Sequence, residues 1–109
     1  MDTKSILQLN RRRLALEKQL AQLGPLMRGS VVNLGTKCGN PNCRCTRGQK
    51  HIKSYYSLST NGKTSIIYLG KRREALAHEC SANYKRLLQI IDEMTLVNMQ
   101  LLKANALHK

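Results

Sequence analysis

The sequence lacks tryptophan and phenylalanine and holds few aromatic side chains of any kind. Its 109 residues include no Trp, no Phe and only four Tyr. A chain of this length suits one domain, so we expect residues 1–109 to form a single domain. A short chain buries little surface, and without large side chains its core should be thin. We therefore expect further stabilisation from a metal ion, a long helix pair or an oligomer.

Acidic residues are absent from a long central stretch. None occurs between Glu17 and Glu74, and the whole chain carries 19 Lys and Arg against six Asp and Glu, a formal net charge of +13. Such an excess is typical of proteins that bind an anionic partner. The missing carboxylates argue against carboxylate acid–base or metal–carboxylate nuclease chemistry in this stretch. No glycine-rich phosphate loop or dinucleotide fingerprint is present either, so we expect a binding protein and not an enzyme.

Long apolar runs are also missing. No run of about 18 apolar residues occurs, so we expect no transmembrane helix and no membrane partner. The apolar pattern near the N-terminus is broken by Arg11-Arg12-Arg13, unlike that of a signal peptide. We therefore expect a cytoplasmic protein, in which four cysteines are more typical of metal ligands than of disulfides.

Two segments show the apolar spacing of amphipathic helices. Residues 3–23 predict a helix, which Asp2 or Thr3 can cap and Gly24-Pro25 ends. Its heptad-like stripe consists of Ile6, Leu9, Leu16, Leu20 and Leu23. Residues 71–107 contain neither Gly nor Pro and would form a helix much longer than the first. The first helix can cover only about half of the second, and the remainder either pairs with another subunit or frays, so we expect a homodimer. The apolar seam of this second helix consists of Leu76, Cys80, Leu87, Ile90, Met94, Val97 and Leu101.

Three strands are predicted between these helices, over residues 29–36, 53–60 and 63–70. Asn61-Gly62 is the preferred pair for a two-residue type I′ turn, which pairs Thr60 with Lys63. Counting back along both strands pairs Tyr56 with Ile67 and Tyr55 with Tyr68. The sequence therefore predicts an α+β fold in the order helix, strand, strand, strand, helix, with a β-hairpin and a cysteine-rich loop.

The cysteine-rich loop predicts a zinc site. Its ligand pattern is C-x4-C-x-C-x5-H, and three thiolates with one imidazole are typical of a closed tetrahedral Zn²⁺ site. His78 and Cys80 form a second candidate pair that could complete the site instead of His51. A nucleophilic Cys45–His51 pair is a further alternative, but three clustered thiols favour coordination. The predicted ligands are Cys38, Cys43, Cys45 and His51.

Several of these motifs occur together in a known family. The chain resembles a family of small bacterial and archaeal proteins of unknown function that are commonly associated with transposons or transposases. In that family Gly-Pro typically follows the histidine, where this chain has Ile52-Lys53. The resemblance implies a role in a mobile genetic element and supplies no activity. It rests on Arg28-Gly29-Ser30, the cysteine motif, His51, Tyr55-Tyr56-x-Leu58-Ser59 and Gly62-Lys63-Thr64, within about residues 28–102.

Basic clusters predict a nucleic-acid surface. Lys and Arg neutralise phosphates and release counterions, and exposed tyrosines such as Tyr55, Tyr56 or Tyr68 can stack on unpaired bases. The sequence has no helix-turn-helix signal and no two-cysteine, two-histidine zinc finger, so we do not expect the protein to read a specific base sequence. We expect duplex DNA, in preference to RNA, because of the transposon resemblance; the sequence alone does not separate the two. The predicted contact residues are Arg11, Arg12, Arg13, Lys37, Arg44, Arg47, Lys50, Lys53, Lys71, Arg72, Arg73 and Tyr55.

Two other classes of function stay open. The chain could be a protein-interaction adaptor whose apolar seam engages a transposase or another protein, or an inhibitor that docks on an acidic enzyme surface. Charge reversal at Arg44 and Arg47 should abolish nucleic-acid binding in the first interpretation. If the chain is an adaptor, changing Leu87, Ile90 or Met94 to Asp should impair its function more than those charge reversals do.

Overall fold

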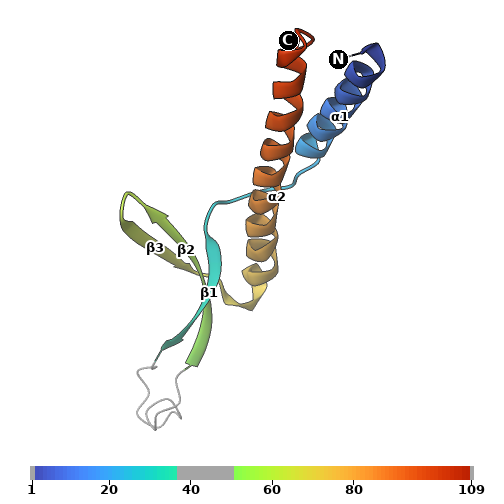
Figure 1. The fold of residues 1–109 in the computed structure, drawn as a ribbon. Coiled ribbons are helices and arrows are strands. Elements are labelled where there is room, and N and C mark those ends of the chain that lie inside the picture. Colours follow the sequence, from blue (N-terminus) through green and yellow to red (C-terminus); the bar gives the residue numbers. More distant parts are fainter. Residues whose placement is uncertain (1, 37–50, 109) are drawn as a thin grey trace, which may run out of the picture. The chain divides into compact units, whose positions relative to one another are not determined.

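The computed structural model describes residues 2–36 and 51–108, except for the side chains of Thr36 and His51 (Figure 1). The fold is α+β, as predicted, with two helices and a three-stranded antiparallel sheet. Its elements are α1 (Thr3–Ala21), β1 (Ser30–Thr36), β2 (His51–Thr60), β3 (Lys63–Tyr68) and α2 (Gly70–Lys103).

The chain divides into two compact units. The helical unit comprises Met1–Gly24 and Asn83–Lys109, and the sheet unit comprises Pro25–Ala82. The first turns of α2 belong to the sheet unit and the rest of α2 to the helical unit. Each unit has its own buried residues, so each is described by itself.

Helix α1 begins where a capping residue is available. The carboxylate of Asp2 accepts a hydrogen bond of 2.8 Å from the backbone N–H of Ser5. This confirms Asp2 as the N-cap, because Asp satisfies a free N–H in the first turn. The helix ends at Ala21 with Gln22 as its C-cap, two residues before the predicted end.

Helix α2 ends four residues before its predicted end. Asn105 adopts a left-handed backbone, with φ of 55°. The N–H of Ala106 donates to the carbonyl of Leu101 at 2.7 Å, and that of Asn105 to the carbonyl of Leu102 at 3.0 Å. These two bonds form a Schellman motif, in which Asn takes the place of the more usual Gly.

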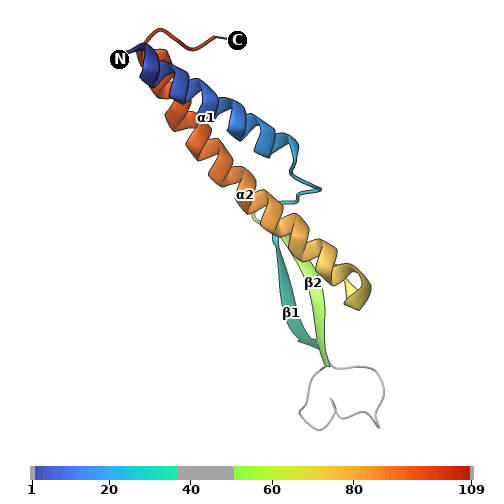
Figure 2. The same ribbon diagram turned by 90° about the vertical axis from the view of Figure 1, so that its right-hand side faces the viewer.

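In the helical unit, α1 runs antiparallel to the C-terminal part of α2 (Figure 2). Leu16 of α1 and Leu101 of α2 are fully buried, and Ile90 is nearly so. All three belong to the predicted heptad stripes, so those stripes form the contact between the helices. At the surface, Arg12 forms an ion pair with Glu93.

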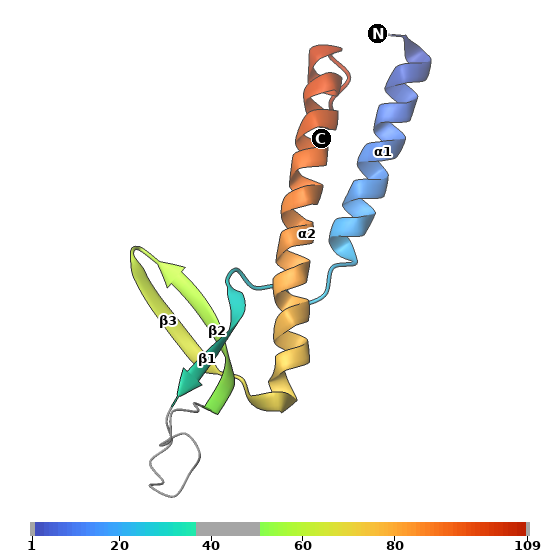
Figure 3. The same cartoon turned by 60° about the horizontal axis from the view of Figure 1, so that its bottom comes forward.

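The sheet has the order β1-β2-β3, with β2 in the centre (Figure 3). The hairpin register is the predicted one, with Tyr56 opposite Ile67 and Tyr55 opposite Tyr68. Asn61 and Gly62 both have positive φ, as a type I′ turn requires. Strand β1 pairs with β2 from Ser30 opposite Ser57 to Thr36 opposite His51.

The first turns of α2 pack on one face of this sheet. Tyr56, Leu69 and Ala77 form a buried cluster with Val31 against it. Leu76, which the predicted seam placed inward, is 54% exposed, whereas Ala77 is 4% exposed. Here α2 contacts a sheet, so the heptad pattern of a helix pair does not set the buried positions.

Candidate nucleic-acid interface

The other face of the sheet carries an aromatic pair, the half-buried Tyr55 and the exposed Tyr68. Side chains alternate along a strand, so Tyr55 and Tyr68 lie on the face opposite Tyr56. Their rings meet edge to face, with centroids 5.7 Å apart and an interplanar angle of 65°. Tyr68 is 51% exposed, whereas Tyr56 is 5% exposed. Of the three tyrosines considered for stacking, Tyr56 is therefore a core residue.

Tyr56 is held in the core by its hydroxyl group. The hydroxyl donates a hydrogen bond of 3.0 Å to the carbonyl of Met27. This bond ties the segment before β1 to the centre of the sheet. It also satisfies the polar end of a buried aromatic side chain, as such a side chain requires.

Cations surround the aromatic pair. The ammonium group of Lys53 lies over the ring of Tyr68, 5.7 Å from its centroid. Lys53, Tyr68, Lys71 and Glu74 line a small pocket of about 190 Å³ beside the start of α2. A cation over an exposed ring contributes only about 0.5–1 kcal/mol, so Lys53 is free to exchange this contact for a phosphate.

Arg73 fixes the turn between β3 and α2. Its Nε donates to the carbonyl of Leu69 at 3.0 Å and its Nη2 to that of Tyr68 at 2.8 Å. Gly70 allows the turn because its φ is 67°. The structure thus gives Arg73, a predicted contact residue, a role in positioning the backbone that carries Tyr68.

Lys71 and Arg72 are exposed in the first turn of α2, which contains no acidic residue. The N-terminus of a helix carries a partial positive charge, so cations there oppose helix stability. The same arrangement concentrates positive potential next to Tyr68. A bound anion would offset the destabilisation of the helix that these two cations cause.

The sheet unit as a whole is strongly cationic. Residues 25–82 contain ten Lys and Arg against two Glu, a net charge of +8. Both glutamates lie on α2, and Glu74 faces His78 with an N···O distance of 3.8 Å. The three strands contain no carboxylate. Glu74 of α2, which lines the pocket with Lys53, Tyr68 and Lys71, is the one carboxylate among the described residues of that pocket.

The three arginines of α1 belong to the other unit and differ in their surroundings. Arg11 is exposed, and Arg12 pairs with Glu93. Arg13 donates to the carbonyl of His108 at 3.0 Å, and its Nε is buried without a hydrogen-bond partner among the described residues. Arg13 therefore belongs to the contact between the helices as well as to the predicted set.

The predicted zinc ligands lie mostly outside the described residues. Four predicted basic contacts lie there too. The backbone of His51 starts β2 and pairs with Thr36, the last residue of β1. Thr36 and His51, the residues between which the cysteine segment (residues 37–50) lies in the sequence, are therefore held on neighbouring strands. The predicted residues outside the described ranges are Cys38, Cys43, Cys45, Lys37, Arg44, Arg47 and Lys50.

The alternative ligands, His78 and Cys80, lie on α2. Cys80 is a buried free thiol, 5% exposed, and its backbone carbonyl accepts a hydrogen bond from Met27. Among residues 2–36 and 51–108, no three His, Cys, Asp or Glu side chains gather as metal ligands would.

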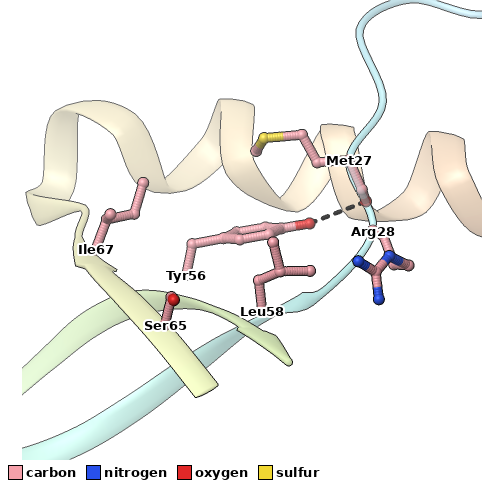
Figure 4. Close-up of a pocket in the computed structure, with 6 residues that line it drawn as sticks. All are labelled: Met27, Arg28, Tyr56, Leu58, Ser65 and Ile67. Carbon is pink, nitrogen blue, oxygen red and sulfur yellow. Dashed lines mark hydrogen bonds between the residues drawn. The ribbon is translucent and has the colours of Figure 1, made fainter. Parts of the chain in front are cut away.

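An apolar pocket of about 350 Å³ lies on the face of the sheet that bears Tyr56 (Figure 4). Leu58, Ile67 and Met27 supply its apolar walls. The guanidinium of Arg28 donates to the carbonyl of Ser59 at 3.0 Å. Because Arg28 and Tyr56 already have internal partners, this pocket offers apolar contact more than polar recognition.

These features define a small, basic α+β protein with one open sheet face that carries tyrosines and cations. The chain belongs to a family described as a domain of unknown function (DUF6788), whose sequence model matches residues 6–78. That range covers most of α1, all three strands and the first turns of α2. The resemblance to a family without assigned function is thereby confirmed.

No curated protein and no solved structure matches the chain. In the described part of the chain, no helix combines the length and apolar character of a membrane span.

Proposed function

We propose that this protein binds nucleic acid, DNA in preference to RNA, and that it acts by binding and not by catalysis. The observation that carries the proposal is the open face of the sheet unit. There Lys53 and Lys71 lie beside the exposed Tyr68, which the half-buried Tyr55 contacts. In the described part of the chain, Glu74 is the one carboxylate of the pocket that these lysines line. Cations neutralise phosphates and release counterions, which is the main sequence-independent contribution to such binding.

Two further parts of the proposal rest on the sequence motifs. Cys38, Cys43 and Cys45 bind Zn²⁺ together with His51, or with His78 or Cys80 in its place. The protein serves a mobile genetic element, in keeping with the family that its motifs resemble. The pairing of Thr36 with His51 supports the zinc site, because it holds both ends of the cysteine segment close together.

A second candidate function is that of an adaptor that binds a transposase or another protein. It is favoured by a row of exposed apolar side chains on α2. These are Leu88, Ile91, Met99 and Leu102. The same row also supports a homodimer.

The function is tested by reversing charge in the sheet unit. Lys71→Glu combined with Arg72→Glu should weaken binding of the full-length protein to a short DNA at least tenfold at moderate salt. The slope of log K against log salt should fall by about two, one for each lost phosphate contact. Glutamates in the first turn of a helix stabilise it, so unfolding of α2 would not explain the loss. The affinities are measured by fluorescence anisotropy over a salt series.

The matched control reverses two lysines of the helical unit. Lys85→Glu with Lys103→Glu changes the net charge by the same amount outside the proposed surface. This control should reduce affinity much less than the first double variant. Equal losses in the two would mean that net charge alone, and not the sheet unit, is responsible. Loss of function on changing Leu87, Ile90 or Met94 to Asp, with unchanged DNA binding, would favour the adaptor.

A further inference from the structure

We infer that Tyr68 and Tyr55 stack on unpaired bases, so that the protein prefers single-stranded nucleic acid to duplex. Lys53 and Lys71 would bind the adjoining phosphates. This inference rests on the proposed function and names the form of nucleic acid that its site takes.

The first support is the placement of the two rings. Tyr55 and Tyr68 occupy directly paired positions on β2 and β3. Tyr55 braces the ring of Tyr68 edge to face, which leaves Tyr68 half exposed. Aromatic rings on neighbouring strands of a sheet face are a platform on which single-stranded bases stack.

The second support is the backbone under Tyr68. The side chain lies beside Gly70, where a Cβ atom would be in van der Waals contact with it, 3.5 Å from the ring atom Cε2 and from the hydroxyl oxygen Oη. Arg73 donates to the backbone carbonyl of Tyr68 at 2.8 Å, so the backbone that carries the ring is fixed. A backbone ordered in this way before binding adds little conformational-entropy cost when a base stacks on the ring.

The third support is charge complementarity. Lys53 lies over the ring of Tyr68 and Lys71 lies beside it. These two cations outnumber Glu74, the one carboxylate among the pocket's described residues, and the strands themselves have none. A base that stacks on the ring displaces the ammonium group of Lys53 towards the sugar–phosphate chain. An apolar ligand or an ordinary protein surface would gain nothing from these cations, but a polyanion would.

Single strands fit this face better than duplex does. In a duplex the flat faces of the bases are covered by their neighbours, and only base edges and phosphates are presented. The tyrosine rings would then have nothing to stack on. Binding to duplex would use the lysines alone, with lower affinity.

The test compares single and double strands on the full-length protein in zinc-containing buffer. The probes are a labelled DNA strand of about 20 nucleotides, its duplex and the RNA of the same sequence; this length exceeds the site size of single-strand binding folds. We expect single-stranded DNA or RNA to bind about tenfold more tightly than duplex. Tyr68→Leu should remove about tenfold of that affinity and leave duplex binding within about twofold, whereas Tyr68→Phe should bind like the original protein.

Two further readouts separate stacking from a structural role. Tyr84→Leu removes a tyrosine from the helical unit and should leave both affinities unchanged. Because the chain has no Trp, its fluorescence comes from tyrosine. Single strands should quench this emission, and the quenching should fall in Tyr68→Leu but not in Tyr84→Leu.

The outcomes separate this inference from the proposed function. Duplex binding equal to or tighter than single-strand binding, with no effect of Tyr68→Leu, overturns the inference and leaves nucleic-acid binding in place. If the unchanged protein binds single strands and duplex no more tightly than the Lys71→Glu/Arg72→Glu variant does, both the inference and the proposed function are overturned. A preference for RNA over DNA single strands supports stacking and corrects the choice of polymer.

Discussion

At the residue scale, Gly29 shows how one backbone position fixes the entry to the sheet. Its φ is 107°, and a Cβ atom there would lie 2.4 Å from the carbonyl oxygen of Ser57. Gly29→Ala should therefore destabilise the protein by at least about 3 kcal/mol, since strain and a clash with backbone add. Urea unfolding followed by far-UV circular dichroism measures the loss.

Gly62→Ala is the matched control for that variant. Gly62 also has a positive φ, 79°, but a Cβ atom there would meet nothing within 4 Å. Gly62→Ala should therefore lower the free energy of unfolding by about 1–2 kcal/mol, because only the left-handed backbone is unfavourable. Similar losses at the two positions would show that the contact with Ser57 does not constrain the entry of β1.

Asp2 gives the protein a pH-dependent helix cap. The hydrogen bond from the N–H of Ser5 lowers the pKa of the Asp2 carboxyl below its ordinary value of 3.8. A lowered pKa in the folded state means that the carboxylate stabilises α1 above pH 3.8 and that this stabilisation is lost as the pH falls through the lowered pKa. Asp2→Ala should therefore lower Tm by a few degrees at pH 7, and the difference should shrink below pH 3.8.

The control for the cap is Asp2→Ser. Serine caps a helix without titrating, so its difference from Asp2→Ala should stay constant with pH. Thermal unfolding followed by circular dichroism from neutral to acidic pH tests both variants. A wild-type advantage over Asp2→Ala that persists unchanged in acid would mean that the carboxylate charge is not the cause.

The sequence of the hairpin predicted which residues pair across it, but not all the roles of their side chains. Asn61-Gly62 placed Tyr55 opposite Tyr68 and Tyr56 opposite Ile67, as observed. Exposure is a tertiary property, and it depends on which face α2 covers. The sequence favoured packing for Tyr56 but did not show which face α2 covers, and it could not reveal that Arg73 donates to the backbone carbonyls of Leu69 and Tyr68.

At the element scale, the helix and strand types followed from periodicity and turn signals, and the errors lie at the ends of elements and at one core position. The strands predicted over 53–60 and 63–70 are His51–Thr60 and Lys63–Tyr68, and Gly70, with φ of 67°, already begins α2. The end of α2 was missed because Gly and Pro are the usual terminators, and the cap here is Asn105. Leu76 was misplaced because a heptad pattern assumes a helix partner, whereas the first turns of α2 meet the sheet.

Because Thr36 pairs with His51, the predicted zinc site should stabilise the adjoining end of the β1–β2 ladder. Removing the metal should loosen the end of the β1–β2 ladder next to the cysteine segment, because metal-binding energy is folding energy. Amide exchange should speed up at residues 33–36 and 52–54 on chelation and stay unchanged in α1. Cys43→Ser should lose its bound zinc and show the same exchange without chelator.

Cys80→Ala serves as the control for the zinc site. Cys80 is buried in the sheet unit, so as a core residue its removal should leave one zinc per chain. Loss of zinc in Cys80→Ala would assign it as a ligand in place of His51. Stoichiometric zinc in Cys43→Ser would show that the ligand assignment is wrong.

At the scale of the whole molecule, charge and apolar surface are divided between the two units. Ten of the 19 basic residues lie in residues 25–82, against two of the six acidic ones. The helical unit instead carries most of the large exposed apolar side chains of the helices. This division fits the proposals that the sheet unit binds nucleic acid and that the helical unit self-associates.

The helical unit has an apolar stripe that its own helices do not cover. Leu88, Ile91, Met99 and Leu102 follow one another at helical spacing on α2 and are all exposed. At 100° per residue this stripe lies about 120° around the helix from the seam that contains Ile90 and Leu101. On α1, Leu7 and Leu14 are also exposed and share one face.

Two such helical hairpins can cover their stripes by forming a four-helix bundle, in which each helix contacts two neighbours. We predict a dimer at micromolar concentration. Ile91→Glu with Met99→Glu should raise the dimer dissociation constant at least about a hundredfold, because each buried carboxylate would lose its hydration. Sedimentation equilibrium measures the constant for each variant.

Leu96→Glu is the control for the dimer. Leu96 is 63% exposed, as fully as Met99 at 62%, but it lies about 100° around α2 from the centre of the stripe. It should therefore leave the dimer intact, whereas a general effect of lost apolar surface would weaken both variants alike. A monomer at micromolar concentration in the unchanged protein would overturn self-association, and the stripe would then be the surface that the adaptor interpretation requires.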